Sequence, residues 1–158
     1  MGISVAVAGK GGTGKTSFCA MLVRSLIETG TKPVLAVDAD PTSNLAEALG
    51  VEVDTMLADI REKGASSEGS PTSGVGRVRL VDDEIQRALV EAEGFDLVAM
   101  GHPEGPRCYC YVNGLLRQSL DRLSSSYQAV VLDNEAGMEH LSRRTTNNID
   151  ALICVMNP

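Results

Sequence analysis

Residues 3–16 read ISVAVAGKGGTGKT, and this stretch decides the fold. Its first part, residues 3–8, is apolar at nearly every position, which is typical of a strand buried on both faces of a sheet. The next eight residues, 9–16, include four glycines. From Lys15 to Glu28 the sequence has a helical pattern, and Gly30 marks its expected end. A buried strand, a glycine-rich turn and a helix therefore follow one another directly.

The turn matches the pattern G-x-x-x-x-G-K-[ST], which binds phosphate when it connects a strand to a helix. Its glycines let backbone amides point at a phosphate, and the helix N-terminus adds partial positive charge. Lys15 is expected to reach the β- and γ-phosphates, and the Thr16 hydroxyl to bind Mg²⁺. A glycine-rich turn without a ligand is the less favoured alternative. The predicted Mg-ATP site comprises Gly9, Lys10, Gly11, Gly12, Thr13, Gly14, Lys15, Thr16 and Ser17.

Apolar runs and helical patterns alternate along the rest of the chain. Further strands are predicted at 34–38, 95–100, 129–133 and 151–156, helices at 43–49, 54–63, 83–93 and 111–123, and a flexible loop at 64–76. Buried strands separated by helices indicate a mostly parallel sheet in a three-layer, doubly wound α/β fold. We expect a single domain over residues 1–158, with ligands at the carboxyl ends of its strands.

Aspartates stand where two of these strands end. Asp38 and Asp40 lie at the end of the 34–38 strand, with Asn44 nearby, and Asp133 ends the 129–133 strand. Mg²⁺ keeps several of its waters and uses few direct protein ligands, so carboxylates on separate strands can serve one ion. Their position after buried strands favours a functional role. The alternative is that each aspartate caps a turn or a helix.

Composition excludes several classes of function. The net charge is −7, which argues against binding nucleic acid, and no apolar run approaches the ~20 residues that span a bilayer. We find no signal peptide and expect a cytoplasmic protein without structural disulfides that does not bind membranes. Of the four cysteines, Cys19 and Cys154 fall in a helical pattern and an apolar strand, so we expect both to be buried.

Lys10 makes the loop resemble the deviant Walker A motif, KGGxGKT, of the MinD and ParA ATPase superfamily. The resemblance implies a MinD-like P-loop ATPase in which Lys10 reaches the partner's nucleotide across a homodimer; the alternative is a solvated surface lysine. It also implies that Asp40 orients the attacking water and that Asp38 supports the magnesium shell. Asp133 stands at the Walker B position and would hold Mg²⁺ through water, with Gly137 closing the second switch.

Cys108 and Cys110 lie one residue apart in the stretch HPEGPRCYCY, residues 102–111. One C-x-C pair supplies two thiolates, whereas a closed structural metal site has about four ligands. A symmetric dimer would supply all four at its twofold axis. From spacing alone, metal binding and simple packing against the following helix both stay open.

The segments PEGPRCYCYVNGLLR and VLDNEAGMEHLSRRTT are similar to those of the CooC-type ATPases, which belong to the MinD superfamily. These proteins assist nickel insertion into carbon monoxide dehydrogenase. The resemblance implies that Cys108 and Cys110 bind Ni²⁺ or Zn²⁺ between two subunits, that nucleotide controls the dimer, and that carbon monoxide dehydrogenase is the client. His102 and Arg107 depart from the family pattern; Arg107 places a positive charge beside the thiols, which favours thiolate.

Two other functions remain open at this stage. One is a MinD- or ParA-type positioning ATPase, and the other is an electron-transfer ATPase whose iron–sulfur cluster uses the same thiolates. Chains of the family that the sequence resembles continue for several elements beyond Pro158. We therefore expect a domain that is either minimal or incomplete at its C-terminus, with Asn157 contacting the base.

Overall fold

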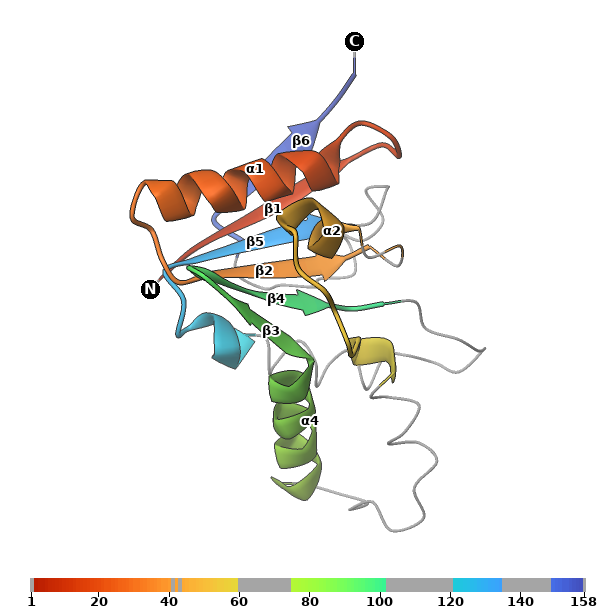
Figure 1. Ribbon diagram of the computed structural model, residues 1–158, viewed down its shortest axis with the longest axis vertical. Coiled ribbons are helices and arrows are strands. Elements are labelled where there is room, and N and C mark those ends of the chain that lie inside the picture. The colour runs from red at the N-terminus through yellow and green to blue at the C-terminus, as the bar shows by residue number, and fades with distance from the viewer. Residues whose placement is uncertain are drawn as a thin grey trace.

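The computed structural model describes residues 2–40, 42, 44–59, 75–101, 121–134 and 149–157. These residues contain one six-stranded sheet in the order β3-β4-β2-β5-β1-β6 (Figure 1). The strands are β1 Ile3–Gly9, β2 Val34–Ala39, β3 Leu89–Ala92, β4 Phe95–Ala99, β5 Ala129–Asn134 and β6 Ala151–Val155. The helices are α1 Lys15–Glu28, α2 Leu45–Leu49 and α4 Val75–Ala88. Short helical turns also cover 57–59 and 121–124.

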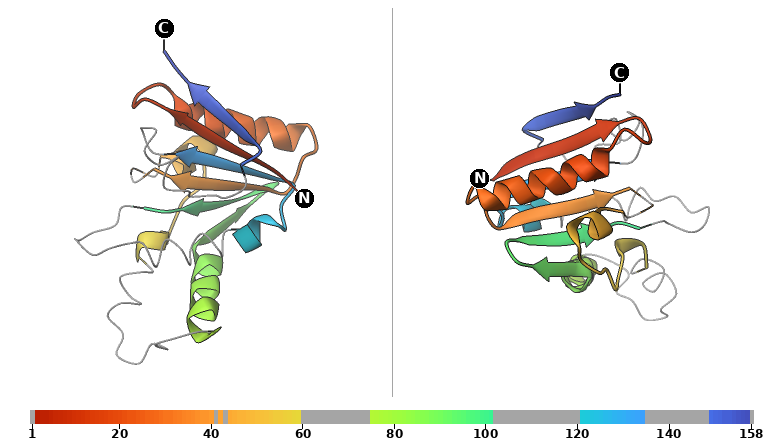
Figure 2. Two further views of the ribbon diagram at one scale, coloured as in Figure 1. Left: turned by 180° about the vertical axis from the view of Figure 1, so that it is seen from behind. Right: turned by 45° about the horizontal axis from the view of Figure 1, so that its top comes forward.

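Helices cover both faces of the sheet, as Figure 2 shows from two sides. Alternate residues of β2 enter two separate cores. Val34 and Ala36 pack with α1 and α2 on one face, whereas Leu35 and Val37 pack on the other face with Ile85 of α4. The side chains on both faces of the strand therefore have a helical layer to contact, which explains why the strand is apolar from Val34 to Val37. This arrangement confirms the predicted three-layer, mostly parallel α/β fold.

The predicted helix over 83–93 is wrong in its last part. Residues 89–92 form β3, which pairs antiparallel with β4 in the register Ala92↔Phe95. A two-residue turn joins the strands, and its second residue, Gly94, has φ 86°, a left-handed conformation that favours glycine. The apolar spacing of the short segment 89–92 fits a helix or a strand, and its pairing with β4 decides between them.

Other predicted boundaries also shift. Helix α4 begins at Val75, so the predicted loop over 64–76 is wrong at its last two residues, and the rest of that loop lies outside the described residues. Helix α2 begins at Leu45, two residues later than predicted. The predicted helix over 54–63 is wrong at residues 54–56, because the helical turn begins only at residue 57, and its residues 60–63 lie outside the described part of the chain. The predicted helix over 111–123 is described only over 121–123, which are helical.

Gly9 occupies a position where the chain has no room for a side chain. It pairs with Val155 of β6, and a Cβ atom on Gly9 would lie 2.3 Å from the Val155 carbonyl oxygen and 3.1 Å from Thr13 Oγ1. The first of these atoms is backbone and cannot rotate away as a side chain can. Glycine at this position therefore allows β6 to pair closely beside the start of the phosphate loop.

We predict that Gly9→Ala lowers the free energy of unfolding by about 3 kcal/mol, because β6 must shift to accommodate the methyl group. Urea denaturation would measure this loss. Gly30→Ala is the matched control, since Gly30 has φ 87° but no atom within 4 Å of a Cβ. The control should lose only ~1 kcal/mol through backbone strain. Equal losses in the two variants would contradict the close approach.

Candidate nucleotide-binding site

The carboxyl ends of three neighbouring parallel strands form the site. In the register of the sheet, Asp133 of β5 pairs with Asp38 of β2 on one side and with Val7 of β1 on the other. Val7 is two residues before Gly9, where the glycine-rich loop begins. The sheet therefore brings the loop and both aspartates to one edge.

The loop of residues 9–14 folds around the carbonyl oxygen of Lys10. This oxygen accepts hydrogen bonds from Thr13 Oγ1 at 2.8 Å, from the Thr13 amide at 3.4 Å and from Lys15 Nζ at 3.5 Å. Gly12 and Gly14 have φ values of 76° and 89°, which a residue with a side chain rarely adopts. The turn thus satisfies its own acceptor while leaving its glycine amides available to a ligand.

Helix α1 begins at the end of this turn without a side-chain cap. Its N-cap is Gly14, and no acidic residue lies in its first turn. The first amides of a helix lack partners within the helix, and the helix dipole makes this end partially positive. A phosphate group would supply both the missing acceptors and the matching charge.

The two lysines of the loop lie in different environments. Lys15 is only 6% exposed, and its ammonium group is close enough to Asp133 to lower the pKa of that carboxyl. The Lys10 side chain is exposed. Lys15 therefore lies inside the site beside Asp133, whereas Lys10 is accessible to other molecules.

Asp133 is fully buried, and neither of its carboxylate oxygens has a hydrogen-bond partner among the described residues. Burial raises the pKa of Asp133, while the nearby Thr16 hydroxyl and the Lys15 ammonium lower it. A buried carboxylate without partners costs free energy unless a ligand compensates it. Mg²⁺ prefers oxygen ligands, so the Asp133 carboxylate and the Thr16 hydroxyl fit this ion.

Asp38 is also fully buried, but its oxygens are engaged. Oδ1 accepts the Asp40 amide at 3.1 Å, and Oδ2 accepts the Leu45 amide at 2.9 Å. Burial raises the pKa of Asp38 to about 6, although these two hydrogen bonds oppose the shift. Asp38 therefore holds the turn that leads into α2 through these two hydrogen bonds. Capping of a turn or helix is the alternative role that the sequence suggests for the aspartates. The part of Asp38 in the magnesium shell stays a prediction.

Asp40 follows on the same turn and is partly buried. Its Oδ1 accepts hydrogen bonds from the Thr42 amide at 2.9 Å and the Thr42 hydroxyl at 2.7 Å. Asn44 Nδ2 in turn donates to Thr42 Oγ1 at 3.0 Å. The carboxylate lies close enough to Asp133 to raise the pKa of that group. The turn thus holds Asp40 beside the predicted magnesium carboxylate.

Comparison with known sequences shows which protein family this chain belongs to. The sequence profile of the CobQ/CobB/MinD/ParA nucleotide-binding domain matches residues 4–156. The chain belongs to this family. Membership is consistent with the geometry above, because the matched range includes the glycine-rich loop, both buried aspartates and the six strands of the sheet except Ile3, the first residue of β1.

Several family members are similar over nearly all of this chain. An uncharacterised ATP-binding protein of Methanocaldococcus jannaschii is 48% identical over 96% of this chain and 60% of its own length. The carbon monoxide dehydrogenase accessory protein CooC of Rhodospirillum rubrum is 36% identical over 99% of this chain and 63% of its own length. Cobyrinic acid a,c-diamide synthase of Mycobacterium smegmatis, with a bound ATP analogue and magnesium, superposes with a TM-score of 0.69 at 26% identity, over 99% of this chain and 59% of that one. The chain thus spans about 60% of the length of these relatives.

Sequence reasoning missed one residue beside Asp133 and misjudged the burial of one cysteine elsewhere in this CobQ/CobB/MinD/ParA domain. Asn134 is 5% exposed, and its Nδ2 donates to the Val7 carbonyl oxygen at 3.1 Å. The signal for it was a polar residue directly after Asp133 in an apolar strand. Cys19 is buried as predicted, and burial next to Asp133 raises the pKa of its thiol. Cys154 is exposed, because β6 is an edge strand whose alternate residues face outward.

Other predicted site residues are less informative. Asn157 is exposed after β6, and its contact with the base stays a prediction. His102, Arg107, Cys108, Cys110 and Gly137 lie outside the described residues. Within the described ranges no group of three or more His, Cys, Asp or Glu side chains could hold a metal ion. In the same ranges no helix is long and apolar enough to cross a membrane.

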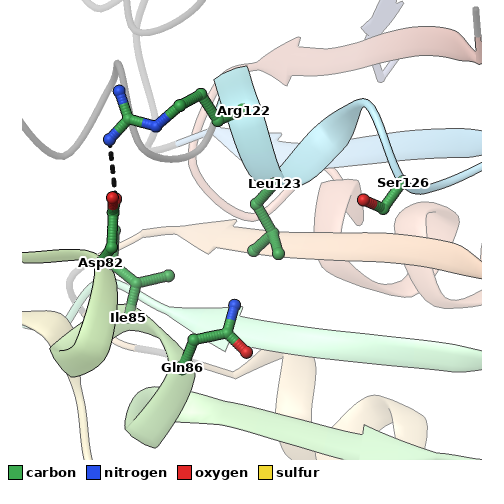
Figure 3. A pocket seen from close by; sticks show the side chains of 6 residues that line it. All are labelled: Asp82, Ile85, Gln86, Arg122, Leu123 and Ser126. Atoms are coloured by element: carbon green, nitrogen blue, oxygen red, sulfur yellow. Dashed lines mark hydrogen bonds and ion pairs between the residues drawn. The ribbon is translucent and has the colours of Figure 1, made fainter. Parts of the chain in front are cut away.

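A cavity of about 250 Å³ lies away from the glycine-rich loop, between α4 and residues 122–126. Figure 3 shows an ion pair between Arg122 and Asp82 at its rim, with an N–O distance of 2.7 Å. Ile85 and Leu123, which also line the cavity, belong to the core on the face opposite α1. This hollow is therefore a gap in the packing between α4 and its neighbour, remote from the residues of the nucleotide site.

We predict that Asp133→Asn raises the free energy of unfolding of the ligand-free protein at neutral pH by on the order of 1 kcal/mol, because the cost of burying this carboxylate without a hydrogen bond outweighs its attraction to Lys15. Urea denaturation would measure the gain, and the variant should lose most of the stabilisation that Mg-ADP gives the parent. The pKa of Asp133 lies above its ordinary value of 3.8, so the parent gains stability as the pH falls through this raised pKa. The advantage of the variant should therefore shrink on acidification.

Asp150→Asn serves as the control for charge removal. Asp150 is exposed, and its Oδ2 accepts the Ser4 amide at 2.8 Å, so it already has a partner. Its replacement should leave stability unchanged or lower it. The interpretation of Asp133 would be wrong if Asp133→Asn were less stable than the parent at neutral pH.

Proposed function

We propose that this chain is the nucleotide-binding part of a Mg²⁺-dependent ATPase whose dimer binds a metal ion and assists nickel insertion into carbon monoxide dehydrogenase. The single observation that supports hydrolysis best is the buried Asp133 beside Lys15 and the helix N-terminus, whose carboxylate accepts no hydrogen bond within the described part of the chain. The metal-handling role rests on the Cys108–Cys110 pair and on the 36% identity to the accessory protein CooC.

In the proposed reaction, water attacks the γ-phosphorus of ATP and the products are ADP and phosphate. Lys15 and the amides of the loop bind the phosphates and stabilise the charge that develops on them. Asp40 positions the attacking water through a hydrogen bond. Mg²⁺, when bound near Thr16 and Asp133, would neutralise part of the phosphate charge.

The exposed side chain of Lys10 supports an action in trans. The backbone of Lys10 is held by the hydrogen bond that its carbonyl oxygen accepts from Thr13, whereas its side chain is exposed to solvent. In a symmetric dimer, two such lysines would each reach the nucleotide of the other subunit. Nucleotide binding and dimer formation would then strengthen one another.

We predict that Lys10→Ala and Lys15→Ala each abolish most ATP turnover, and that mixing the two variants restores activity. In a mixed dimer one site has its own Lys15 and receives Lys10 from the partner, so it is complete. Random exchange should give about a quarter of the parental activity, since half of the dimers are mixed and half of their sites are complete. Phosphate release would measure this recovery. A mixture no more active than the separate variants would refute the trans role.

The predicted metal site also requires two subunits. Two thiolates from each chain make a four-ligand site without any further residue, and such a set suits Ni²⁺ or Zn²⁺. Metal binding and dimerisation must then be linked, so each increases the affinity of the other by the same factor. Nucleotide would act on the metal through the same dimer.

We predict one bound metal ion per dimer in protein titrated anaerobically, and loss of this ion in the double variant Cys108→Ser/Cys110→Ser. Metal analysis with a parallel measurement of mass in solution would test both. Cys154→Ser is the matched control, because it removes an exposed thiol outside the pair. Saturation at one ion per monomer would contradict the shared site. Broad visible absorption of the purified protein would instead favour an iron–sulfur cluster on the same thiolates.

A further inference from the structure

Strand β5 ends unevenly between its two neighbours. Its pairing with β1 ends at Val7↔Asp133, whereas its pairing with β2 continues one residue further to Ala39↔Asn134. On the β1 side the Asn134 side chain replaces the missing backbone contact, because its Nδ2 donates to the Val7 carbonyl oxygen at 3.1 Å. The hydrogen bond is buried and joins residues 127 positions apart. Asn134 therefore connects the end of β5 to β1, the strand that leads into the glycine-rich loop.

We propose that Asn134 is a positioning residue that holds the Asp133 carboxylate in place relative to the phosphate loop. Asp133 is the adjacent residue, and its own oxygens have no hydrogen bond among the described residues that could orient it. Thr16 and Cys19 lie near enough to lower the pKa of Asp133, but neither meets hydrogen-bond geometry, so the backbone sets where the carboxylate lies. The backbone in turn is held to β1 by the Asn134–Val7 hydrogen bond, two residues before Gly9.

The position of the Asp133 carboxylate affects how well the site binds Mg²⁺. The ion requires nearly ideal octahedral geometry with short distances to its oxygen ligands, so a carboxylate displaced by a fraction of an ångström binds it less well. Thr16 is fixed to the loop through α1, and Asp133 is fixed to β5. The side-chain amide of Asn134 forms a hydrogen bond between β5 and β1, close to where β1 leads into the glycine-rich loop.

The chemistry of an amide suits this position. The preceding residues of β5, from Val130 to Leu132, are apolar and buried. A leucine at 134 would continue that pattern but would remove the hydrogen-bond donor of the Val7 carbonyl oxygen. An aspartate would remove the donor and also place another negative charge beside Asp133. Asparagine provides the donor without adding charge.

The test compares Asn134→Leu with Tyr127→Phe. Tyr127 is 7% exposed near the other end of β5, and its hydroxyl donates to the Asp96 carboxylate. Each variant therefore loses one hydrogen bond close to the same strand, which is buried at Asn134 and part-buried at Tyr127, but only Asn134 lies beside Asp133. Binding of fluorescent ADP would be measured over a range of free Mg²⁺ and again with excess chelator, together with urea denaturation.

For Asn134→Leu we expect the half-saturating Mg²⁺ concentration to rise about five- to tenfold, the equivalent of one lost buried hydrogen bond. Affinity for ADP in chelator should stay within about twofold of the parent, since the loop itself is unchanged. Tyr127→Phe should lower stability without changing the Mg²⁺ dependence. Asn134→Ala, which also lacks the donor, should reproduce the Mg²⁺ effect and replaces the leucine variant if that variant does not fold.

Two results would overturn the inference. One is an unchanged Mg²⁺ dependence in the Asn134 variants, and the other is an equal rise in Mg²⁺ requirement in Tyr127→Phe, which would indicate a general effect of destabilisation. The inference rests on the proposed nucleotide site but not on hydrolysis or on metal binding by Cys108 and Cys110. A parent protein without Mg²⁺-dependent ADP binding would refute the proposed function itself, and this outcome is distinct from a normal parent with unaffected variants.

Discussion

The in-register parallel pairing of β1, β5 and β2 is the constraint on which the site depends. It aligns Val7, Asp133 and Asp38, so the phosphate loop and two carboxylates meet at one edge of the sheet. Side chains alternate between the faces of a strand, and Val131 packs on the face of α1. A slip of one residue in β5 would move Asp133 to the opposite face. The apolar packing of the strand thus also determines where its terminal carboxylate points.

This arrangement places charge where an apolar core would be more stable. Three charged side chains are buried, those of Asp38, Asp133 and Lys15. They lie at the carboxyl ends of the strands, next to the core that contains Val7 and Val131. Burial raises the pKa of both aspartates, because it disfavours their ionised forms. Asp38 recovers part of this cost through two backbone hydrogen bonds, whereas Asp133 has none among the described residues. A ligand that binds only the folded state would compensate the remainder.

Sequence reasoning located the parts of the molecule whose signals are local. The glycine-rich loop, helix α1 and the strands β1, β2 and β5 could be predicted because each has a strong pattern within its own residues. Strand β3 could not, because four residues with mixed spacing become a strand only when β4 pairs with them. The exposure of Cys154 depends on β6 being an edge strand, and the role of Asn134 depends on its distance from Val7. These features arise from contacts between distant segments, which a pattern within one segment does not contain.

The loop combines a firm hydrogen bond with a weak one at the same acceptor. Thr13 Oγ1 approaches the Lys10 carbonyl oxygen to 2.8 Å, whereas Lys15 Nζ lies at 3.5 Å, at the outer limit of a hydrogen bond. Phosphate oxygens are charged acceptors and compete well for an ammonium group. Lys15 can therefore turn to a nucleotide while the Thr13 hydrogen bond keeps the turn closed. A turn that is already closed before the ligand arrives lowers the free energy that binding would otherwise lose to ordering the loop.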